Sequence, residues 1–353
     1  MTARARISSP EDREGIADLM RRALGLDERA VAIKPDFQRW KYWDIHPLTD
    51  AGRSYVLDGE HGITAHGCRW PMRILSSVGS YDAFHLIDWA ADASRAGAGL
   101  QVLRDTCENS AALFSVGGSP STRRILPALG DHLRRRGGQE RTPSYRVAGH
   151  LYFLSRPLKP VAAALQESSA DWKAPARILR NAYRAGVPSL RLGADWGFRQ
   201  VTPSEIPPSL WPQPSSEVAV TARTAELLQH FVRCPALTQP ALYVLTRKGN
   251  AVAYFFLVLA GTHVRVADYG PANLEEAAAK NLGMAAQLAA KEHYPEALRI
   301  SAATSEEPVR SCWLQAGFRV AYVEEIRALV VEPALQDVSE YRLTYLDCDA
   351  LCL

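Results

Sequence analysis

The sequence predicts an α/β (α+β) protein made of two consecutive units that share one order of helices and strands. Residues 84–103 read as a strand, a glycine turn and a helix. The pattern of helices and strands around this stretch returns after residue 217. Proline accumulates between the two copies. We therefore expect domains at residues 1–155 and 217–353, joined by a helical and proline-rich linker at residues 156–216.

Length and composition limit the classes of protein that fit. A chain of 353 residues is long for one average domain and suits two. With 47% hydrophobic and 22% charged residues, the composition is that of a soluble globular protein. The net charge of +3 is small and the basic residues are dispersed, so we expect no nucleic-acid partner.

Cysteine spacing and apolar runs indicate the compartment. The six cysteines form no Cys-x-x-Cys pair and no metal-like spacing with histidine, which favours free thiols in a reducing cytoplasm and no metal site. The first 30 residues contain no signal-peptide core. The longest apolar run, residues 251–260, is about half of what crosses a bilayer. We therefore expect a cytoplasmic protein that makes no membrane contact.

The first unit begins with a helix whose ends are marked in the sequence. Ser9 suits the N-cap, Pro10 the first helical position, and Glu11 and Asp12 the first turn. Gly25 should end this helix after residue 24. The next predicted helix, residues 37–43, is rich in aromatic and basic side chains. We expect it to pack three rings into the core, with a ligand-facing wall as the alternative.

Strands and helices alternate through the rest of the chain. In the first unit we expect strands at 55–57, 62–65, 70–77, 84–89, 111–116 and 147–153, with a turn at Asp58-Gly59 and a helix at 121–129. The linker should contain a helix at 161–185. In the second unit we expect helices at 224–231, 274–293 and 306–316, and strands at 242–246, 251–259, 262–269, 298–303 and 318–323. The C-terminal residues should form a last strand.

The stretch at residues 84–103 has the parts of an anion site. Glycines at 97 and 99 let backbone N–H groups converge, and the positive end of the following helix dipole favours an anion. The six residues Ser94-Arg95-Ala96-Gly97-Ala98-Gly99 resemble the pyrophosphate loop Arg/Gln-x-x-Gly-x-Gly/Ala of the GNAT acyltransferase superfamily. Both glycines match, whereas Ser94 stands at the first position and the arginine is displaced by one residue.

Other segments support this resemblance. Trp-Lys-Tyr-Trp precedes the first hairpin, Gly-Gly-Ser-Pro-Ser precedes a helix that ends at Leu129-Gly130, and residues 312–318 look like the closing signature of the family. The resemblance implies two tandem GNAT folds, each with a mixed, mostly antiparallel central sheet flanked by helices. Asp88-Trp89 and Asp268-Tyr269 fall at the same place in the two copies. The second copy lacks the six-residue loop, so we expect its cofactor site to be degenerate.

The resemblance also implies a co-substrate, acetyl-CoA or another acyl-CoA. Its pantetheine arm should pair with the strand edge near Ala90 and Ala91, as an added strand does. Its diphosphate should be held by the backbone N–H groups of six residues, Arg95, Ala96, Gly97, Ala98, Gly99 and Leu100.

Asp88 is the first candidate for the base that deprotonates an amine acceptor. A partly desolvated carboxylate at this place should have its pKa raised toward neutrality. A buried structural acid is the alternative role. His85 is the second candidate, on the opposite face of a regular strand, with packing as its alternative role. The tyrosine that protonates the thiolate in many family members is replaced by Leu126 in the first copy and by Trp313 in the second.

These observations favour an acyl-CoA-dependent N-acyltransferase, with acetyl-CoA as the default donor. Its acceptor would be a small amine such as an amino sugar, an amino acid or a polyamine. A non-catalytic acyl-CoA-binding or scaffold protein is the first alternative, because the tyrosine is missing. A tRNA-dependent aminoacyl transferase of the tandem GNAT type is the second, although the small net charge counts against it.

Overall fold

The computed structural model describes residues 4–106, 110–117, 122–129, 144–167, 191–348 and 351. The elements of the first half are β1 (Arg6–Ile7), η1 (Pro10–Asp12), α1 (Arg13–Leu24), η2 (Val31–Ile33), α2 (Pro35–Gln38), η3 (Arg39–Trp43), β2 (Ser54–Gly59), β3 (Gly62–Ser76), β4 (Gly79–Ala91), α3 (Ala98–Thr106), β5 (Ala112–Val116) and β6 (Ser144–Pro157). A further helix covers residues 122–129.

After β6 the chain forms α5 (Pro160–Glu167), β7 (Trp196–Val201), η4 (Pro203–Glu205), η5 (Pro208–Leu210), β8 (Val218–Thr221), α7 (Ala225–Val232), β9 (Thr238–Arg247), β10 (Asn250–Ala260), β11 (His263–Gly270), α8 (Glu276–His293), β12 (Arg299–Thr304), α9 (Glu307–Gln315), β13 (Arg319–Val330), η6 (Pro333–Leu335), β14 (Glu340–Arg342) and η7 (Tyr345–Asp347).

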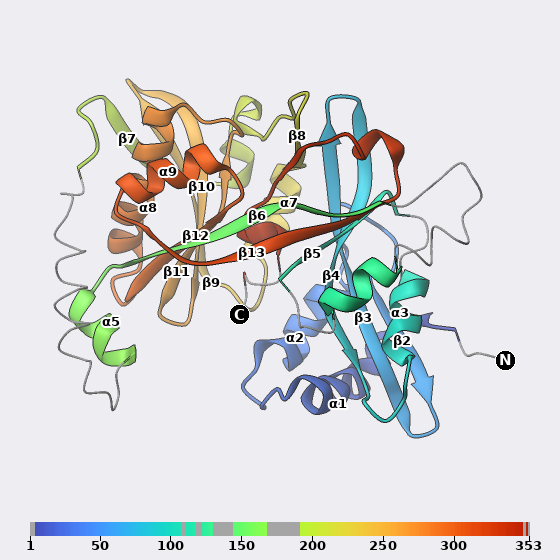
Figure 1. Cartoon of the computed structure of the whole chain (residues 1–353). Helices are drawn as coiled ribbons and strands as arrows, with labels where there is room; N and C mark the ends of the chain where they lie inside the picture. Colours follow the sequence, from blue (N-terminus) through green and yellow to red (C-terminus); the bar gives the residue numbers. More distant parts are fainter. Residues whose placement is uncertain are drawn as a thin grey trace.

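One sheet runs through both halves of the molecule. Its strand order is β1-β2-β3-β4-β5-β13-β6-β12-β11-β10-β9-β7. In Figure 1, β6 and β13 cross the centre side by side and join the two lobes. Strand β13 of the second half pairs with β5 of the first half, and β6 of the first half pairs with β12 of the second. The domain boundaries predicted from the sequence therefore do not divide the sheet.

The two halves repeat one strand arrangement. In each, three antiparallel strands (β2-β3-β4 or β9-β10-β11) are followed by a helix (α3 or α8) and by a strand parallel to the third one (β5 or β12). The parallel pairing is short in both halves, since it covers residues 83–85 with 112–114 and residues 263–266 with 299–302. Beyond these residues the paired strands separate.

Helices cover both faces of the first half of the sheet. Ile16, Leu19 and Met20 of α1 pack in one core with the ring of Phe37 and with Ile87 of β4. On the opposite face, Leu103 of α3 and Leu126 and Leu129 of the helix at residues 122–129 pack against Phe84 and Leu86 of β4. This alternation assigns each residue before Asp88 to one face of β4.

Local signals in the sequence gave the correct helix ends. The backbone N–H of Ser9 donates to Asp12 Oδ2 at 2.8 Å, and Gly25 takes φ of +66° directly after α1. The segment at residues 37–43 forms α2 and a turn of π-helix, with the rings of Phe37, Trp40 and Tyr42 buried as expected.

The expected C-terminal strand is wrong. Residues Tyr345–Asp347 form a 3₁₀ turn, because Thr344 caps it and the Asp347 carboxylate turns inward to a buried arginine. The linker helix expected at residues 161–185 begins as α5, and residues 168–185 lie outside the described residues. Among the helices that the structure describes, none combines the length and hydrophobicity needed to span a bilayer.

The shared sheet yields a prediction for the isolated first half. A fragment of residues 1–216 lacks β13, so β5 and β6 both lose a partner strand and expose unpaired edges. We expect this fragment to aggregate or to show no cooperative unfolding when it is followed by near-UV circular dichroism. Co-expression with residues 217–353 should restore a folded 1:1 complex. A monomeric fragment with a single sharp unfolding transition would contradict this prediction.

Candidate functional site

A bulge interrupts β4 at the residue singled out from the sequence. Cys68 of β3 pairs with Ile87 and His66 pairs with Ala90, so two residues of β4 lie opposite the single residue Gly67. The first of the two is Asp88, whose φ of +50° is unusual for a residue with a side chain. An extra residue in one strand bends it and reverses the alternation of its side chains.

Because of the bulge, His85 and Asp88 lie on the same face of the sheet. The prediction that His85 faces away from Asp88 assumed a regular strand, and it is wrong for this reason. Asp88 accepts a hydrogen bond from Tyr42 of η3, which packs on the face covered by α1. Ala83 and Ile87, which alternate with His85 along β4, belong to the core that contains α1, so His85 faces the same side.

Asp88 is half of a buried ion pair. Lys41 Nζ lies 2.8 Å from Asp88 Oδ2, and the two side chains are 4% and 5% exposed. The hydroxyl of Tyr42 donates to the same oxygen at 2.7 Å. Burial alone would raise the pKa of Asp88, but the attraction of Lys41 and its hydrogen bond outweigh burial and hold the pKa below its usual value. The expected rise toward neutrality is therefore wrong, and the missing factor is Lys41.

A chain of hydrogen bonds fixes the backbone at the bulge. The Trp43 indole N–H donates to Ser8 Oγ at 3.1 Å, and the Ser8 hydroxyl donates to Ser54 Oγ at 2.6 Å. Ser54 Oγ lies 2.9 Å from His66 Nε2, and His66 Nδ1 lies 3.0 Å from the carbonyl oxygen of Asp88. A carbonyl only accepts, so His66 Nδ1 carries the proton and His66 Nε2 accepts from Ser54. Burial lowers the pKa of His66 to about 4, which keeps its ring neutral.

β4 and β5 separate at one end of their short ladder. The last pair in their ladder joins His85 to Phe114. Just beyond it, the backbone N–H of Val116 donates to His85 Nε2 at 3.3 Å, so the imidazole bridges the two strands where they part. Burial, together with the charge of Lys41, lowers the pKa of His85 to about 4. From this residue to Ala91, β4 pairs with β3 on one edge, and no described residue pairs with its other edge.

Both glycines of the turn have a geometric reason. Gly97 adopts φ of +81°, a conformation that side chains disfavour. At Gly99 a Cβ atom would come within 3.1 Å of Ala91 Cβ and 3.3 Å of Trp89 Nε1. The Trp89 indole N–H donates to the Gly99 carbonyl oxygen at 2.9 Å. The start of α3 is thereby held against the end of β4.

Two of the six expected backbone donors are engaged within the turn. The N–H of Arg95 donates to Asp92 O at 3.1 Å, and that of Ala98 donates to Arg95 O at 3.2 Å. The Arg95 side chain donates to Asp58 O at 2.7 Å and to Thr64 Oγ1 at 3.0 Å. It therefore ties the turn to the hairpin between β2 and β3. Because N–H groups in the first turn of a helix lack partners within the helix, the remaining candidates are those of Ala96, Gly97, Gly99 and Leu100.

An open polar cleft of about 590 Å³ adjoins the turn. Arg22, Ser94, Arg95 and the tip of the β2–β3 hairpin border it. By contrast, the apolar cavity next to Lys41 measures about 20 Å³, which is room for about one water molecule. Of the two spaces, only the polar cleft has the size of a ligand site.

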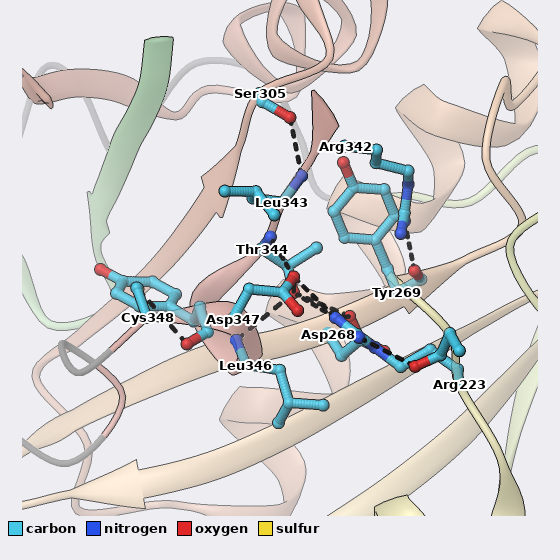
Figure 2. A network of polar contacts seen from close by, with 12 residues as sticks. Arg223, Asp268, Tyr269, Ser305, Arg342, Leu343, Thr344, Leu346, Asp347 and Cys348 are labelled. Carbon is cyan, nitrogen blue, oxygen red and sulfur yellow. Dashed lines mark hydrogen bonds and ion pairs between the residues drawn. The ribbon is translucent and has the colours of Figure 1, made fainter. Parts of the chain in front are cut away.

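In the second half, side chains bridge the space between the equivalent strands, β11 and β12. The Tyr269 hydroxyl, at the end of β11, lies 2.6 Å from Thr304 Oγ1, at the end of β12. It also donates to Glu306 Oε2 at 2.7 Å, and Arg342 Nε donates to that same oxygen at 2.7 Å. Figure 2 shows Arg342 beside the ring of Tyr269, where the C-terminal segment enters.

Asp268, the counterpart of Asp88, belongs to a buried network. Arg223 donates to its two carboxylate oxygens at 2.9 and 3.2 Å, and Tyr254 donates to it at 2.6 Å. Arg223 also pairs with Asp347 at 2.7 Å, and Thr344 donates to Asp268 at 2.8 Å, as Figure 2 shows. Arg223 holds the pKa of Asp268 low although burial opposes this. This carboxylate anchors the C-terminal segment.

The two positions expected to carry a tyrosine are buried in apolar surroundings. Leu126 is 1% exposed in the core between α3 and β4. Trp313 is fully buried, and its indole N–H donates to Ala279 O at 3.0 Å. In the residues that the structure describes, no group of three or more histidine, cysteine or acidic side chains is arranged to bind a metal.

Sequence reasoning missed three residues of this site: Lys41, Tyr42 and His66. Lys41 and Tyr42 lie within the aromatic-basic segment at residues 37–43. The alternation of aromatic rings with a basic residue in that segment was a signal for both of them. His66 gave no signal, because a lone histidine in a strand has no distinctive pattern.

Comparisons with known proteins were made for the sequence and for the structure. No protein-family model matches the sequence, and no curated protein matches it. Solved structures do match over almost the whole chain. A probable N-acyltransferase from Enterococcus faecalis V583 has a TM-score of 0.55 and 11% identity, covering 95% of this chain and 74% of its own. A tandem GNAT protein from the clavulanic acid biosynthesis pathway has a TM-score of 0.54 and 12% identity, with 92% and 96% covered.

A third match is Saccharomyces cerevisiae N-myristoyltransferase, solved with bound myristoyl-CoA. Its TM-score is 0.56 and its identity 10%, with 93% of this chain and 78% of its own covered. Identities this low establish the fold alone. The chain is thus a tandem GNAT-fold protein with a mostly antiparallel mixed sheet flanked by helices, as the resemblance implied.

The buried pair of Lys41 and Asp88 gives a prediction for stability. Lys41→Met leaves a buried carboxylate without its counter-ion and should lower the free energy of unfolding by about 3–5 kcal/mol in urea titrations. Since the pKa of Asp88 is lower in the folded state, the pair stabilises the protein above the unfolded pKa of about 3.9. This contribution is lost as the pH falls through the folded value.

Arg73→Met is the matched control, because Arg73 pairs with Asp82 at the surface at 3.1 Å. It should change the free energy of unfolding by less than about 1 kcal/mol. Equal effects of the two substitutions would show that Lys41 is not the counter-ion of a buried charge.

Proposed function

We propose that the chain is an acyl-CoA-dependent N-acyltransferase that binds its donor along the edge of β4 in the first half, beyond the last pair of β4 with β5. The observation that carries this proposal is that, among the described residues, this edge has no partner strand between His85 and the start of α3. In the second half, Tyr269 and Thr304 bridge the equivalent strands. Acetyl-CoA is the default donor, and a small amine is the acceptor.

The edge of β4, the start of α3 and the adjoining polar cleft each suit one part of an acyl carrier. The free N–H groups at the start of α3 and the helix dipole suit a diphosphate. The edge of β4 near Ala90 and Ala91 suits the two amides of a pantetheine arm, which would pair as an added strand does. The polar cleft beside Arg22 and Arg95 leaves space for the rest of the nucleotide. The donor supplies an activated acyl group as a thioester.

Asp88 takes a different role from the one expected of a base. Its charge is neutralised by Lys41, and its low pKa makes it a weak proton acceptor. In our proposal Asp88 is a positioning residue, which holds Lys41 and Tyr42 against the bulge. The proton of the amine then passes to solvent.

A non-catalytic acyl-CoA-binding role is the second candidate. The observation in its favour is that Leu126 and Trp313 occupy the positions expected for a tyrosine acid, and neither side chain transfers a proton. Calorimetry with acetyl-CoA, followed by thiol release with a panel of amines, separates the two. Binding with thiol release supports the enzyme, and binding without it supports the second candidate. Binding of tRNA in place of coenzyme A would overturn both.

Gly97 tests the diphosphate site directly. Gly97→Asp places a negative charge beside the turn and should weaken acetyl-CoA binding at least about tenfold in calorimetry, because like charges repel. Gly249→Asp is the matched control, since Gly249 has the same φ of +81° and equally open surroundings in a hairpin of the second half. The two variants should lose similar stability, and the control should bind acetyl-CoA as the wild type does. Wild-type affinity in Gly97→Asp would contradict the diphosphate site.

A further inference from the structure

His85 carries a buried polar atom without a partner. The side chain is 3% exposed, and its Nδ1 has no hydrogen-bond partner among the residues that the structure describes. Leaving a buried polar atom unsatisfied is energetically costly. Such an atom is a candidate for contact with a ligand.

The neighbours of His85 determine which nitrogen bears the proton. The backbone N–H of Val116 donates to Nε2, so Nε2 presents its lone pair. The nearby charges of Lys41 and Asp88 oppose each other, and burial favours the neutral ring. In a neutral imidazole with an accepting Nε2, the proton lies on Nδ1. The unpartnered atom is therefore an N–H donor. The ring cannot take up a proton at Nε2 without losing the hydrogen bond from the Val116 N–H.

The position of His85 fits the reacting end of a bound carrier. Its ring bridges β4 and β5 at the last paired residues, so it lies where the free edge of β4 begins. The start of α3 lies at the other end, beyond Ala91. At about 3.3 Å per residue, the β4 edge between these ends measures roughly 15–20 Å. A carrier held by its diphosphate at α3 would extend along this edge and place its acyl group near His85.

We propose that His85 is a catalytic residue that donates its Nδ1–H to the carbonyl oxygen of the acyl group, an inference that rests on the proposed function. The amine nitrogen forms a bond to the carbonyl carbon, and the C–O π pair moves to the oxygen. That oxyanion accepts the hydrogen bond while the proton stays on His85. The oxyanion pair then re-forms the C=O bond of the amide, the C–S bond breaks, and its electron pair leaves with the sulfur of coenzyme A. The nitrogen loses its proton to water, and the thiolate takes one from water.

This role differs from the base that the sequence suggested for His85. A base must present a lone pair to the amine, and the only lone pair of this ring is engaged by Val116. A fixed neutral donor needs no reorganisation as charge develops on the oxygen, which makes such donors effective.

Two amide substitutions separate the nitrogens of His85. In His85→Asn the side-chain NH₂ falls near the position of Nδ1 and keeps the donor. In His85→Gln the amide reaches the position of Nε2, keeps a partner for Val116 and loses the donor. We expect His85→Gln to lower kcat at least about a hundredfold with little change in KM for acetyl-CoA, and His85→Asn to retain most activity.

A spectroscopic measurement makes the test independent of the acceptor. The infrared band of the thioester carbonyl, isotope-labelled in acetyl-CoA, should shift to lower frequency on binding to the wild type and to His85→Asn, but not to His85→Gln. Nitrogen NMR of the free protein should show a protonated Nδ1 in His85. His46→Gln is the matched control, since His46 is also buried with an unpartnered nitrogen, away from the cleft. It should leave the carbonyl band unchanged.

The outcomes distinguish the inference from the function on which it rests. Failure of the wild type to bind acetyl-CoA overturns the proposed function. Binding with the same carbonyl band in the wild type and His85→Gln overturns the inference alone, as does a protonated Nε2 in the free protein. Equal losses of affinity and kcat in His85→Gln would assign His85 a structural role and also overturn it.

Discussion

A single extra residue in β4 sets the geometry of the candidate site. The bulge places Asp88 on the same face as His85, and it bends the strand just beyond its last pair with β5. A residue with φ of +50° is costly, so its surroundings must hold it. Lys41 and Tyr42 bind its carboxylate, and His66 binds its carbonyl oxygen. Together these contacts hold the bulge in place, just beyond the last pair of β4 with β5.

The two halves differ in the side chains that lie between their separating parallel strands. Both halves separate their parallel strands after a few pairs, so the backbone alone does not explain the difference. In the second half a tyrosine and a threonine meet across the gap, and Glu306 and Arg342 complete the bridge. In the first half, His85 lies at the last pair of the two strands and accepts a hydrogen bond from the backbone N–H of Val116 in β5. The difference therefore lies in a few side chains at the strand ends.

Local features of the sequence predicted much of the fold and little of the site. Helix caps and hairpin turns depend on residues close in sequence, so Ser9 and Gly25 sufficed to place the ends of α1. The glycine turn was found for the same reason. The bulge, the ion pair and the exchange of β6 and β13 between the halves depend on contacts between distant residues. Lys41 and Asp88 are 47 positions apart, and no periodic pattern connects them. The expected pKa of Asp88 was wrong because its counter-ion was not visible.

Equivalent positions of the two halves separate structural from functional residues. Asp88 and Asp268 occupy the same place, and each is neutralised by a buried cation, Lys41 or Arg223. A shared, fully paired acid is explained by packing alone, because a buried charge must be compensated. The two halves differ at the position three residues before each of these acids. Arg265 of the second half donates to Leu351 O of the C-terminal segment, whereas Nδ1 of His85 has no partner among the described residues. This difference is the reason why we propose that His85, and not Asp88, contacts a ligand.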